Sequence, residues 1–214
     1  MAITVVGSVA LDTIETPFGS AENVLGGAAS HFTLSASLYD TVNLVAVVGA
    51  DFPERYLNYF RERNVDLRGL QTVPGSTFRW GGRYGLDMNS RDTLFTELGV
   101  FADFNPEVPE AYRQAEVVFA ANILPQLQQN VLRQTERGAP ARLRALDTMN
   151  LWIETTRDSL LEAMRQVDVV LIAEEEVRQL TETTSLRAGA RFILDLGPRL
   201  LVVKQGSYGA LLFD

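Results

Sequence analysis

"DVVLIAEEEVRQLT", residues 168–181, joins two patterns within one short stretch. Residues 168–173 form a nearly continuous apolar run, which is typical of a strand that is covered on both faces. Residues 174–180 begin with three glutamates, which the dipole of a helix favours in its first turn. A buried strand that leads into a helix is the repeating unit of an α/β fold.

The same alternation recurs along the chain. Apolar runs that read as further buried strands are "ITVVGSVAL", "VNLVAVVG", "EVVFAA", "LRALD" and "RLLVVKQ". Helical patterns lie at residues 28–39, 53–63, 124–133, 155–166, 174–180 and 186–194. This alternation predicts an α/β fold, with a mostly parallel sheet and helices on both faces.

Two segments break the alternation. Residues 76–99, "STFRWGGRYGLDMNSRDTLFTELG", have two arms rich in Thr and aromatic residues around a polar turn, which predicts a β-hairpin. Residues 12–27, "DTIETPFGSAENVLGG", are a second β-like excursion. Neither brings a second core, so we expect one domain over residues 1–214. The two insertions should form a small β lid over the carboxyl edge of the sheet, where ligands bind in such folds.

Composition excludes several classes of function. The net charge is −8 and the basic residues are scattered, which argues against nucleic acid or an anionic membrane as the main partner. The absence of cysteine excludes disulfides and thiol catalysis, and a single histidine excludes a histidine metal cluster. No apolar run approaches the ~18 residues of a membrane span, and no signal peptide is visible. We therefore expect a cytoplasmic protein.

Four features in chain order resemble the ribokinase-like (PfkB) carbohydrate and nucleoside kinases. They are "ITVVGSVALD", "LGGAASHFTLSASLYD", "VNLVAVVGADFPE", and "DVVLIAEEEVRQLT" followed by "LLVVKQGSYGALLF". The resemblance implies a three-layer, Rossmann-like fold. It also implies an enzyme that uses ATP and Mg²⁺ to phosphorylate a hydroxyl of a sugar or nucleoside.

The resemblance also implies the residues that bind the acceptor. Asp12 would accept hydrogen bonds from hydroxyls, and Gly26 and Gly27 would let them approach backbone amides. The alternative for Asp12 is a turn residue that caps local amides. His31 stands where the family usually has asparagine; it either contacts substrate or is satisfied within its helix.

The hairpin and the segment "DFPE" offer further contacts. Arg83 of the hairpin, with Arg79 and Trp80, would close over the ligand, or else form a solvated face. Asp51 is expected first as the N-cap of the following helix and second as a ligand contact.

The phosphate side follows from the last two motifs. Glu176 matches the family's glutamate, which acts on Mg²⁺ through water, while Ala173 replaces the family's asparagine. Lys204 would neutralise phosphate charge, and Gly206 and Gly209 would border the nucleotide; the alternative is an ordinary hairpin with a surface lysine.

The family's Gly-Ala-Gly-Asp segment, which supplies the catalytic base, does not occur in this sequence. Asp147 and Asn150 follow a strand in the manner of the family's Asp-x-Asn segment and should shape the floor of the site. We expect the base to lie beyond Asp214, so that residues 1–214 contain no catalytic residue, bind poorly and do not turn over alone.

Three functions compete. The first is the kinase. The second is a non-catalytic sugar- or nucleotide-binding module, which the replacements at His31 and Ala173 favour. The third, a dinucleotide-dependent oxidoreductase, needs Gly-x-Gly-x-x-Gly after the first strand, and "VVGSVALD" lacks it. The resemblance further implies a possible homodimer that pairs through the lid.

Overall fold

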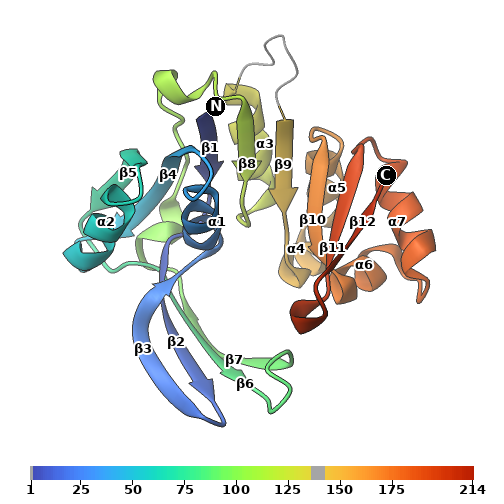
Figure 1. Ribbon diagram of the computed structural model, residues 1–214, viewed down its shortest axis with the longest axis horizontal. Helices are drawn as coiled ribbons and strands as arrows, with labels where there is room; N and C mark the ends of the chain where they lie inside the picture. Colours follow the sequence, from blue (N-terminus) through green and yellow to red (C-terminus); the bar gives the residue numbers. More distant parts are fainter. Residues whose placement is uncertain (1, 136–142) are drawn as a thin grey trace. The chain divides into compact units, whose positions relative to one another are not determined.

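The computed structural model describes residues 2–135 and 143–214 (Figure 1). Contacts within the chain define two units, Met1–Pro109 and Glu110–Asp214, which are treated separately below. The expectation of a single domain stays a prediction.

The first unit contains three parallel strands in the order β1-β4-β5. Their bounds are β1 (Ala2–Val6), β4 (Thr41–Gly49) and β5 (Val65–Val73). Helix α1 (Ala28–Ala36) packs on β1 and β4, and α2 (Glu54–Arg61) packs on β5. The apolar runs predicted β1 and β4 but not β5. Exposed polar residues at Arg68, Gln71 and Thr72 interrupt the apolar pattern of β5, because this strand ends the sheet.

The two insertions of the first unit form one small sheet, in the order β3-β2-β6-β7. Its strands are β2 (Ala10–Thr16), β3 (Gly19–Gly26), β6 (Arg79–Tyr84) and β7 (Arg91–Glu97). The outer pairs are antiparallel, whereas β2 and β6 are parallel, with Asp12 opposite Trp80. A 3₁₀ helix, η1 (Gly99–Asp103), follows this sheet. Its role as a lid stays a prediction.

The second unit contains five neighbouring strands in the order β12-β11-β10-β9-β8. The strands are β8 (Val117–Ala120), β9 (Leu143–Asp147), β10 (Val169–Ala173), β11 (Leu200–Lys204) and β12 (Ala210–Phe213). Strands β8 to β11 pair in parallel and β12 pairs antiparallel with β11. Two 3₁₀ helices are η2 (Glu110–Tyr112) and η3 (Gly206–Tyr208).

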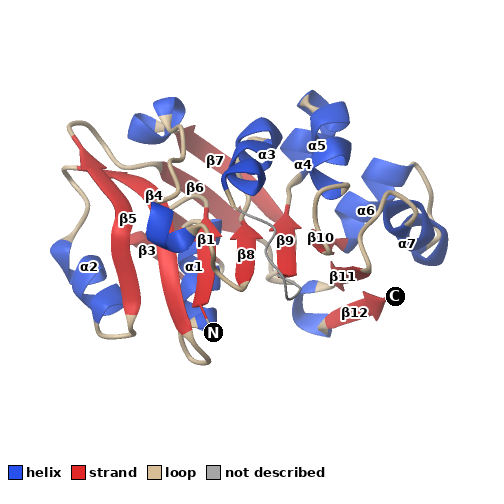
Figure 2. Cartoon of the chain, turned by 90° about the horizontal axis from the view of Figure 1, so that it is seen from above, coloured by secondary structure: helices blue, strands red, loops and turns tan. Residues whose placement is uncertain are grey.

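Helices flank the strands of the second unit (Figure 2). They are α3 (Pro125–Gln134), α4 (Asn150–Thr155), α5 (Arg157–Met164), α6 (Glu174–Thr181) and α7 (Leu186–Leu194). The prediction of a single helix over residues 155–166 is wrong at the start of that range. Thr156 leaves helical geometry at φ −142° and ψ 40°, and this ends α4 before α5 begins.

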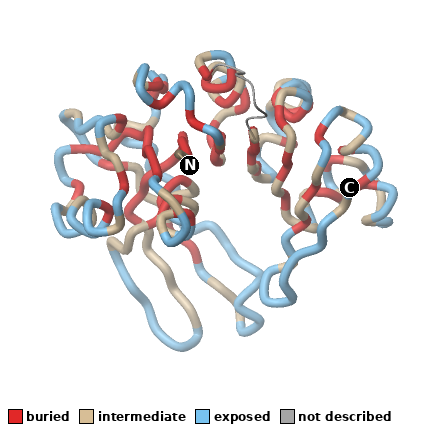
Figure 3. The backbone as a smooth tube through the Cα atoms, turned by 45° about the horizontal axis from the view of Figure 1, so that its top comes forward, coloured by how far each residue is buried: buried red, intermediate tan, exposed pale blue. Residues whose placement is uncertain are grey.

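Burial follows the prediction of covered parallel strands. Figure 3 shows buried residues along most of the parallel strands and on the helices, while β3 and β7 are mostly exposed. In the described ranges, no helix is long and apolar enough to cross a membrane. Mostly parallel strands with helices, plus a small second sheet, confirm the predicted α/β class.

Candidate functional site

Asp12 lies in β2 and has an unsatisfied carboxylate. Its Oδ1 is buried and has no hydrogen-bond partner among the described residues. A Cβ atom on Gly26 would lie 2.0 Å from Asp12 Oδ2, so the carboxylate occupies the space that a side chain at residue 26 would need. Burial raises the pKa of Asp12 to about 6. Such a carboxylate can accept a hydrogen bond that the protein itself does not supply.

Gly27 is required for a different reason from Gly26, because a Cβ atom at residue 27 would meet backbone atoms and not a side chain. It has φ +93°, and a Cβ there would lie 2.4 Å from the carbonyl oxygen of Ser8. The amides of Ala28 and Ala29, at the start of α1, donate to Ser8 Oγ (3.1 Å) and Ser8 O (3.0 Å). Ser8 already satisfies these two amides, whereas Asp12 Oδ1 has no donor among the described residues.

His31 and Arg83 also belong to the first unit. His31 is exposed in the first turn of α1. Arg83 donates from Nε to Glu15 Oε2 at 2.8 Å, and both side chains are substantially exposed. Within residues 2–135, no hydrogen bond joins either side chain to Asp12. Their contacts with an acceptor stay predictions.

Asp51 is not a helix cap, and that prediction is wrong. Pro53 occupies the N-cap position of α2, and no side chain caps it. Asp51 Oδ1 instead accepts from the Thr77 amide and hydroxyl, both at 2.7 Å, and Oδ2 accepts from Arg79 at 2.9 Å. Partial burial opposes ionisation of Asp51, but these hydrogen bonds outweigh it and hold its pKa below the usual range.

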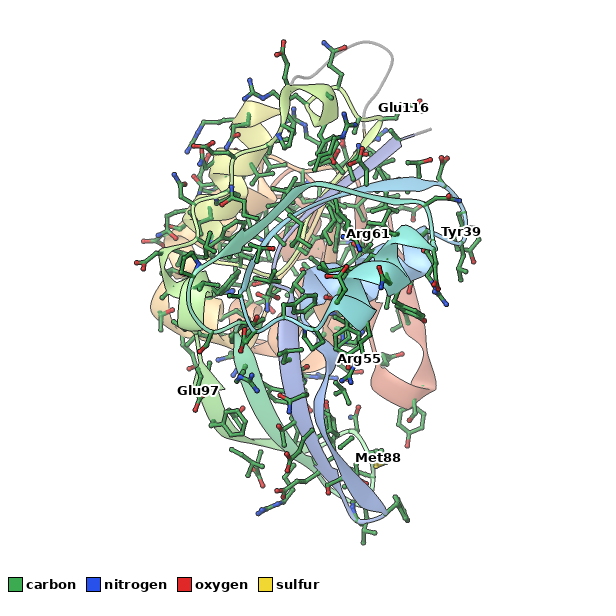
Figure 4. All side chains as sticks on the ribbon, turned by 90° about the vertical axis from the view of Figure 1, so that its left-hand side faces the viewer. Tyr39, Arg55, Arg61, Met88, Glu97 and Glu116 are labelled. Atoms are coloured by element: carbon green, nitrogen blue, oxygen red, sulfur yellow. The ribbon has the colours of Figure 1, made fainter. Side chains whose placement is uncertain are left out.

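Arg79 also links this carboxylate to the second sheet, since it donates to Asn23 Oδ1 on β3. The backbone oxygen of Asn23 accepts from the Tyr56 hydroxyl (2.8 Å) and from Arg55 (3.4 Å), both on α2. Figure 4 shows Arg55 at the end of α2 that lies nearest the second sheet. Asn23 could not be identified from the sequence, because its φ of +52° within a strand appears only in the structure.

In the second unit, Asp147, Ala173 and Lys204 end three neighbouring parallel strands, β9, β10 and β11. Asp147 Oδ1 is buried without a hydrogen-bond partner among the described residues. Burial raises the pKa of Asp147 to about 7; Lys204 and the Asn122 amide pull it down, and Glu176 pushes it up. Asn150, its partner in the predicted motif, is exposed at the start of α4.

Glu176 and the turn after β11 complete this cluster. Glu176 Oε2 accepts from the Ala173 amide at 2.8 Å, so part of the carboxylate holds the start of α6. Lys204 pairs with Ala173 across the sheet and is exposed. Gly206 and Gly209 adopt φ of +56° and +93°, in the left-handed region that glycine tolerates, and this makes the turn possible.

Glu174 is part of a local network, not a free acid. It accepts from Arg178 and Gln205, both at 2.6 Å, and these hydrogen bonds hold its pKa below the usual range. The reading of Glu174 as a structural residue of the first helical turn agrees with these contacts.

Gln128 and Asn122 support the second cluster, and the sequence analysis missed both. Gln128 is fully buried, and its amide donates to the carbonyls of Ala120, Ala121 and Asp147 at 2.9–3.2 Å. Asn122 accepts from the indole of Trp152 at 2.8 Å. A polar residue on the apolar side of a helix, as Gln128 is, was the one available signal.

The chain matches the model of the pfkB family carbohydrate kinases over residues 3–214. The cytidine kinase of Thermococcus kodakarensis is 30% identical over 214 residues, which cover 99% of this chain and 76% of that protein. The protein therefore belongs to the pfkB family of carbohydrate kinases.

Solved structures agree on the fold. The adenosine kinase of Sinorhizobium meliloti superposes with a TM-score of 0.80 at 17% identity, covering 98% of this chain and 76% of that one. A protein described as a ribokinase II from E. coli, in complex with ATP and Mg²⁺, gives 0.79 at 14% identity, covering 99% and 75%. These likenesses confirm the ribokinase-like fold predicted from the sequence.

The residues of the second cluster fit the chemistry of Mg²⁺ and phosphate. Asp147 and Glu176 offer oxygen atoms, which Mg²⁺ prefers, and Lys204 offers a cation. In the described ranges, no three acidic, histidine or cysteine side chains gather into a metal site. An ion held here would therefore take most of its ligands from water and phosphate.

Proposed function

We propose that this protein is an ATP-dependent kinase that phosphorylates a hydroxyl of a sugar or nucleoside. The observation that carries the proposal is the buried, unpartnered carboxylate of Asp12 beside Gly26, in a chain of this family. The two oxygens of a carboxylate can accept charge-assisted hydrogen bonds from two vicinal hydroxyls. Hydroxyls supply the donors that Asp12 Oδ1 lacks.

The acceptor side involves more than the carboxylate. Gly26 and Gly27 let the chain turn against Asp12 and Ser8, and His31 and Arg83 are exposed polar groups that would contact the acceptor's remaining hydroxyls. An acceptor that hydrogen-bonds to the ionised Asp12 favours that form, so binding lowers the pKa of Asp12 from its value of about 6.

The second cluster serves the nucleotide. ATP supplies the phosphoryl group, and Mg²⁺ neutralises its charge. Lys204 would neutralise phosphate oxygens, the turn at Gly206 and Gly209 would border the nucleotide, and Glu176 would hold water on the metal. The amide that asparagine would supply is absent at Ala173; Asp147 lies in the same cluster and offers a buried acceptor.

A non-catalytic binding module is the second candidate. Ala173, which replaces the family's asparagine, favours it. We propose that residues 1–214 alone bind acceptor weakly without turnover. Reading the gene past codon 214 separates the two: an intact segment supports the kinase, and a degenerate one supports the module.

A phosphotransfer assay tests the kinase directly. The full product of the gene, with ATP and Mg²⁺, should phosphorylate at least one member of a panel of sugars and nucleosides. Asp12→Asn should lower kcat/KM by about 10- to 100-fold, the range expected when a charged acceptor is lost. No turnover with any member of the panel, or full activity in Asp12→Asn, would contradict the proposal.

A further inference from the structure

The second sheet presents a carboxylate and an indole side by side on one face. Asp12 on β2 lies directly opposite Trp80 on β6 in the parallel pairing. Residues paired across neighbouring strands point to the same face of a sheet. Asp12 and Trp80 therefore share a face of the second sheet.

Each of these side chains lies over a glycine. A Cβ atom on Gly82 would lie 2.0 Å from Cη2 of Trp80, just as one on Gly26 would lie 2.0 Å from Asp12 Oδ2. Because Gly82 has no side chain, the six-membered ring of the indole can occupy the space over this residue, two positions from Trp80 itself, with Cζ2 and Cζ3 each 2.7 Å from that Cβ position.

The surroundings suit a flat, polarisable group. Arg91 on β7 places its guanidinium carbon 5.8 Å from the centroid of the Trp80 ring, at the outer limit of a cation–π contact. Trp80 is half-buried, so part of the ring stays accessible. A free sugar offers hydroxyls to Asp12 and only a small C–H face to the indole, whereas a base adds a larger, planar aromatic face.

We propose that the acceptor is a nucleoside, with its ribose hydroxyls on Asp12 and its base stacked on the indole of Trp80. This inference rests on the proposed function and adds a specificity-determining residue to it. Stacking on an aromatic side chain adds ~1–3 kcal/mol per base, or ~5- to 150-fold in affinity. Trp80 therefore discriminates nucleosides from free sugars.

The test compares cytidine, adenosine and ribose as ligands by isothermal titration calorimetry on the full gene product. Trp80→Leu should weaken both nucleosides about ten-fold and change ribose by less than two-fold. Trp80→Phe should restore most of the lost nucleoside affinity. Gly82→Ala should weaken nucleosides as Trp80→Leu does, because its Cβ displaces the indole.

Phe95→Leu is the matched control. Phe95 lies over Gly81 in the same way, but Gly81 and Gly82 are adjacent in β6 and so face opposite sides of the sheet. Nucleoside affinity should stay within two-fold of the unmodified protein. Thermal unfolding of each variant checks that the sheet is intact.

Equal losses for ribose and nucleosides in Trp80→Leu, or none for either, would overturn the inference. If ribose and the nucleosides still bind through Asp12 after such a result, the proposed function stands and only the role of Trp80 is wrong. If neither nucleoside binds the unmodified protein, the inference fails, and the phosphotransfer panel decides the proposed function separately.

Discussion

The carboxylate of Asp12 fills the space that a side chain on Gly26 would occupy, with 2.0 Å between Oδ2 and the Cβ position. This close approach explains why a glycine stands at the end of β3, and it places the carboxylate where none of the described residues donates to Oδ1. Gly26 thus determines where the carboxylate of Asp12 can lie.

Gly26→Ala should therefore push the carboxylate out of place. We expect a loss of about 1–3 kcal/mol in the free energy of unfolding, because the methyl group overlaps packed atoms, and at least ten-fold weaker acceptor binding. Chemical denaturation and calorimetry measure the two effects. Ser20→Ala, at an exposed position of β3, is the control and should change neither quantity. Unchanged binding in Gly26→Ala would contradict the account.

The raised pKa of Asp12 predicts a pH dependence. The pKa in the folded protein is about 6, against 3.8 as the ordinary value. The proton is held more tightly in the folded state, so this stabilising contribution is complete below pH 3.8 and is lost as pH rises through 6. Relative to Asp12→Asn, the unfolding free energy of the unmodified protein should fall by about 1–3 kcal/mol between pH 4 and pH 7. A constant difference between the two proteins would refute the assignment.

The contact of Asp51 with Thr77 and Arg79 predicts energetic coupling. Asp51→Ala should cost about 1–3 kcal/mol in the free energy of unfolding, because it leaves the Thr77 amide and Arg79 without their acceptor. A double-mutant cycle with Arg79→Met should show a coupling energy of at least ~0.5 kcal/mol. Additive effects would mean that Asp51 and Arg79 act independently.

Gln128 should matter more for stability than its place on a helix suggests. Gln128→Leu leaves three carbonyl oxygens near the ends of β8 and β9 without this donor, which we expect to cost about 1–3 kcal/mol. The exposed neighbour Gln126 is a matched control, and Gln126→Leu should stay within about 0.5 kcal/mol. Equal effects of the two changes in chemical denaturation would show that the buried contacts contribute little.

Lys204 should influence both Asp147 and the nucleotide. Lys204 lowers the pKa of Asp147, so Lys204→Gln should raise that pKa above about 7. Nuclear magnetic resonance titration of the carboxyl carbon measures it. The same change should weaken binding of Mg²⁺–ATP about ten-fold, whereas Lys204→Arg should retain most of it. An unchanged pKa together with unchanged affinity would remove Lys204 from the site.

Much of the framework could be predicted from the sequence. Strands β1, β4, β8, β9, β10 and β11 are short apolar runs, because they are buried between other elements. Strand β5 was missed because it lies at the edge of its sheet and carries polar residues. These residues interrupt the pattern of apolar positions by which a strand is recognised. The apolar pattern of a strand reflects how much of the strand is buried. A half-exposed strand such as β5 therefore shows only a weak apolar pattern.

The site was predicted less completely, because its contacts join distant residues. Asp12 and Gly26 were identified through the family resemblance, but the overlap between them depends on strand pairing. Asp51 was misjudged because the local capping pattern ignores donors 26 residues away. Nothing local marks Asn23 as the acceptor of Arg79.

The most direct test of the central claim is a titration of the 214-residue protein with ribose, followed by ¹H–¹⁵N amide shifts. We predict shifts centred on residues 10–14 and 24–28, and at least ten-fold weaker binding in Asp12→Asn. Equal affinity in the two proteins, or shifts confined to other residues, would contradict the assignment of Asp12 as the group that holds the acceptor.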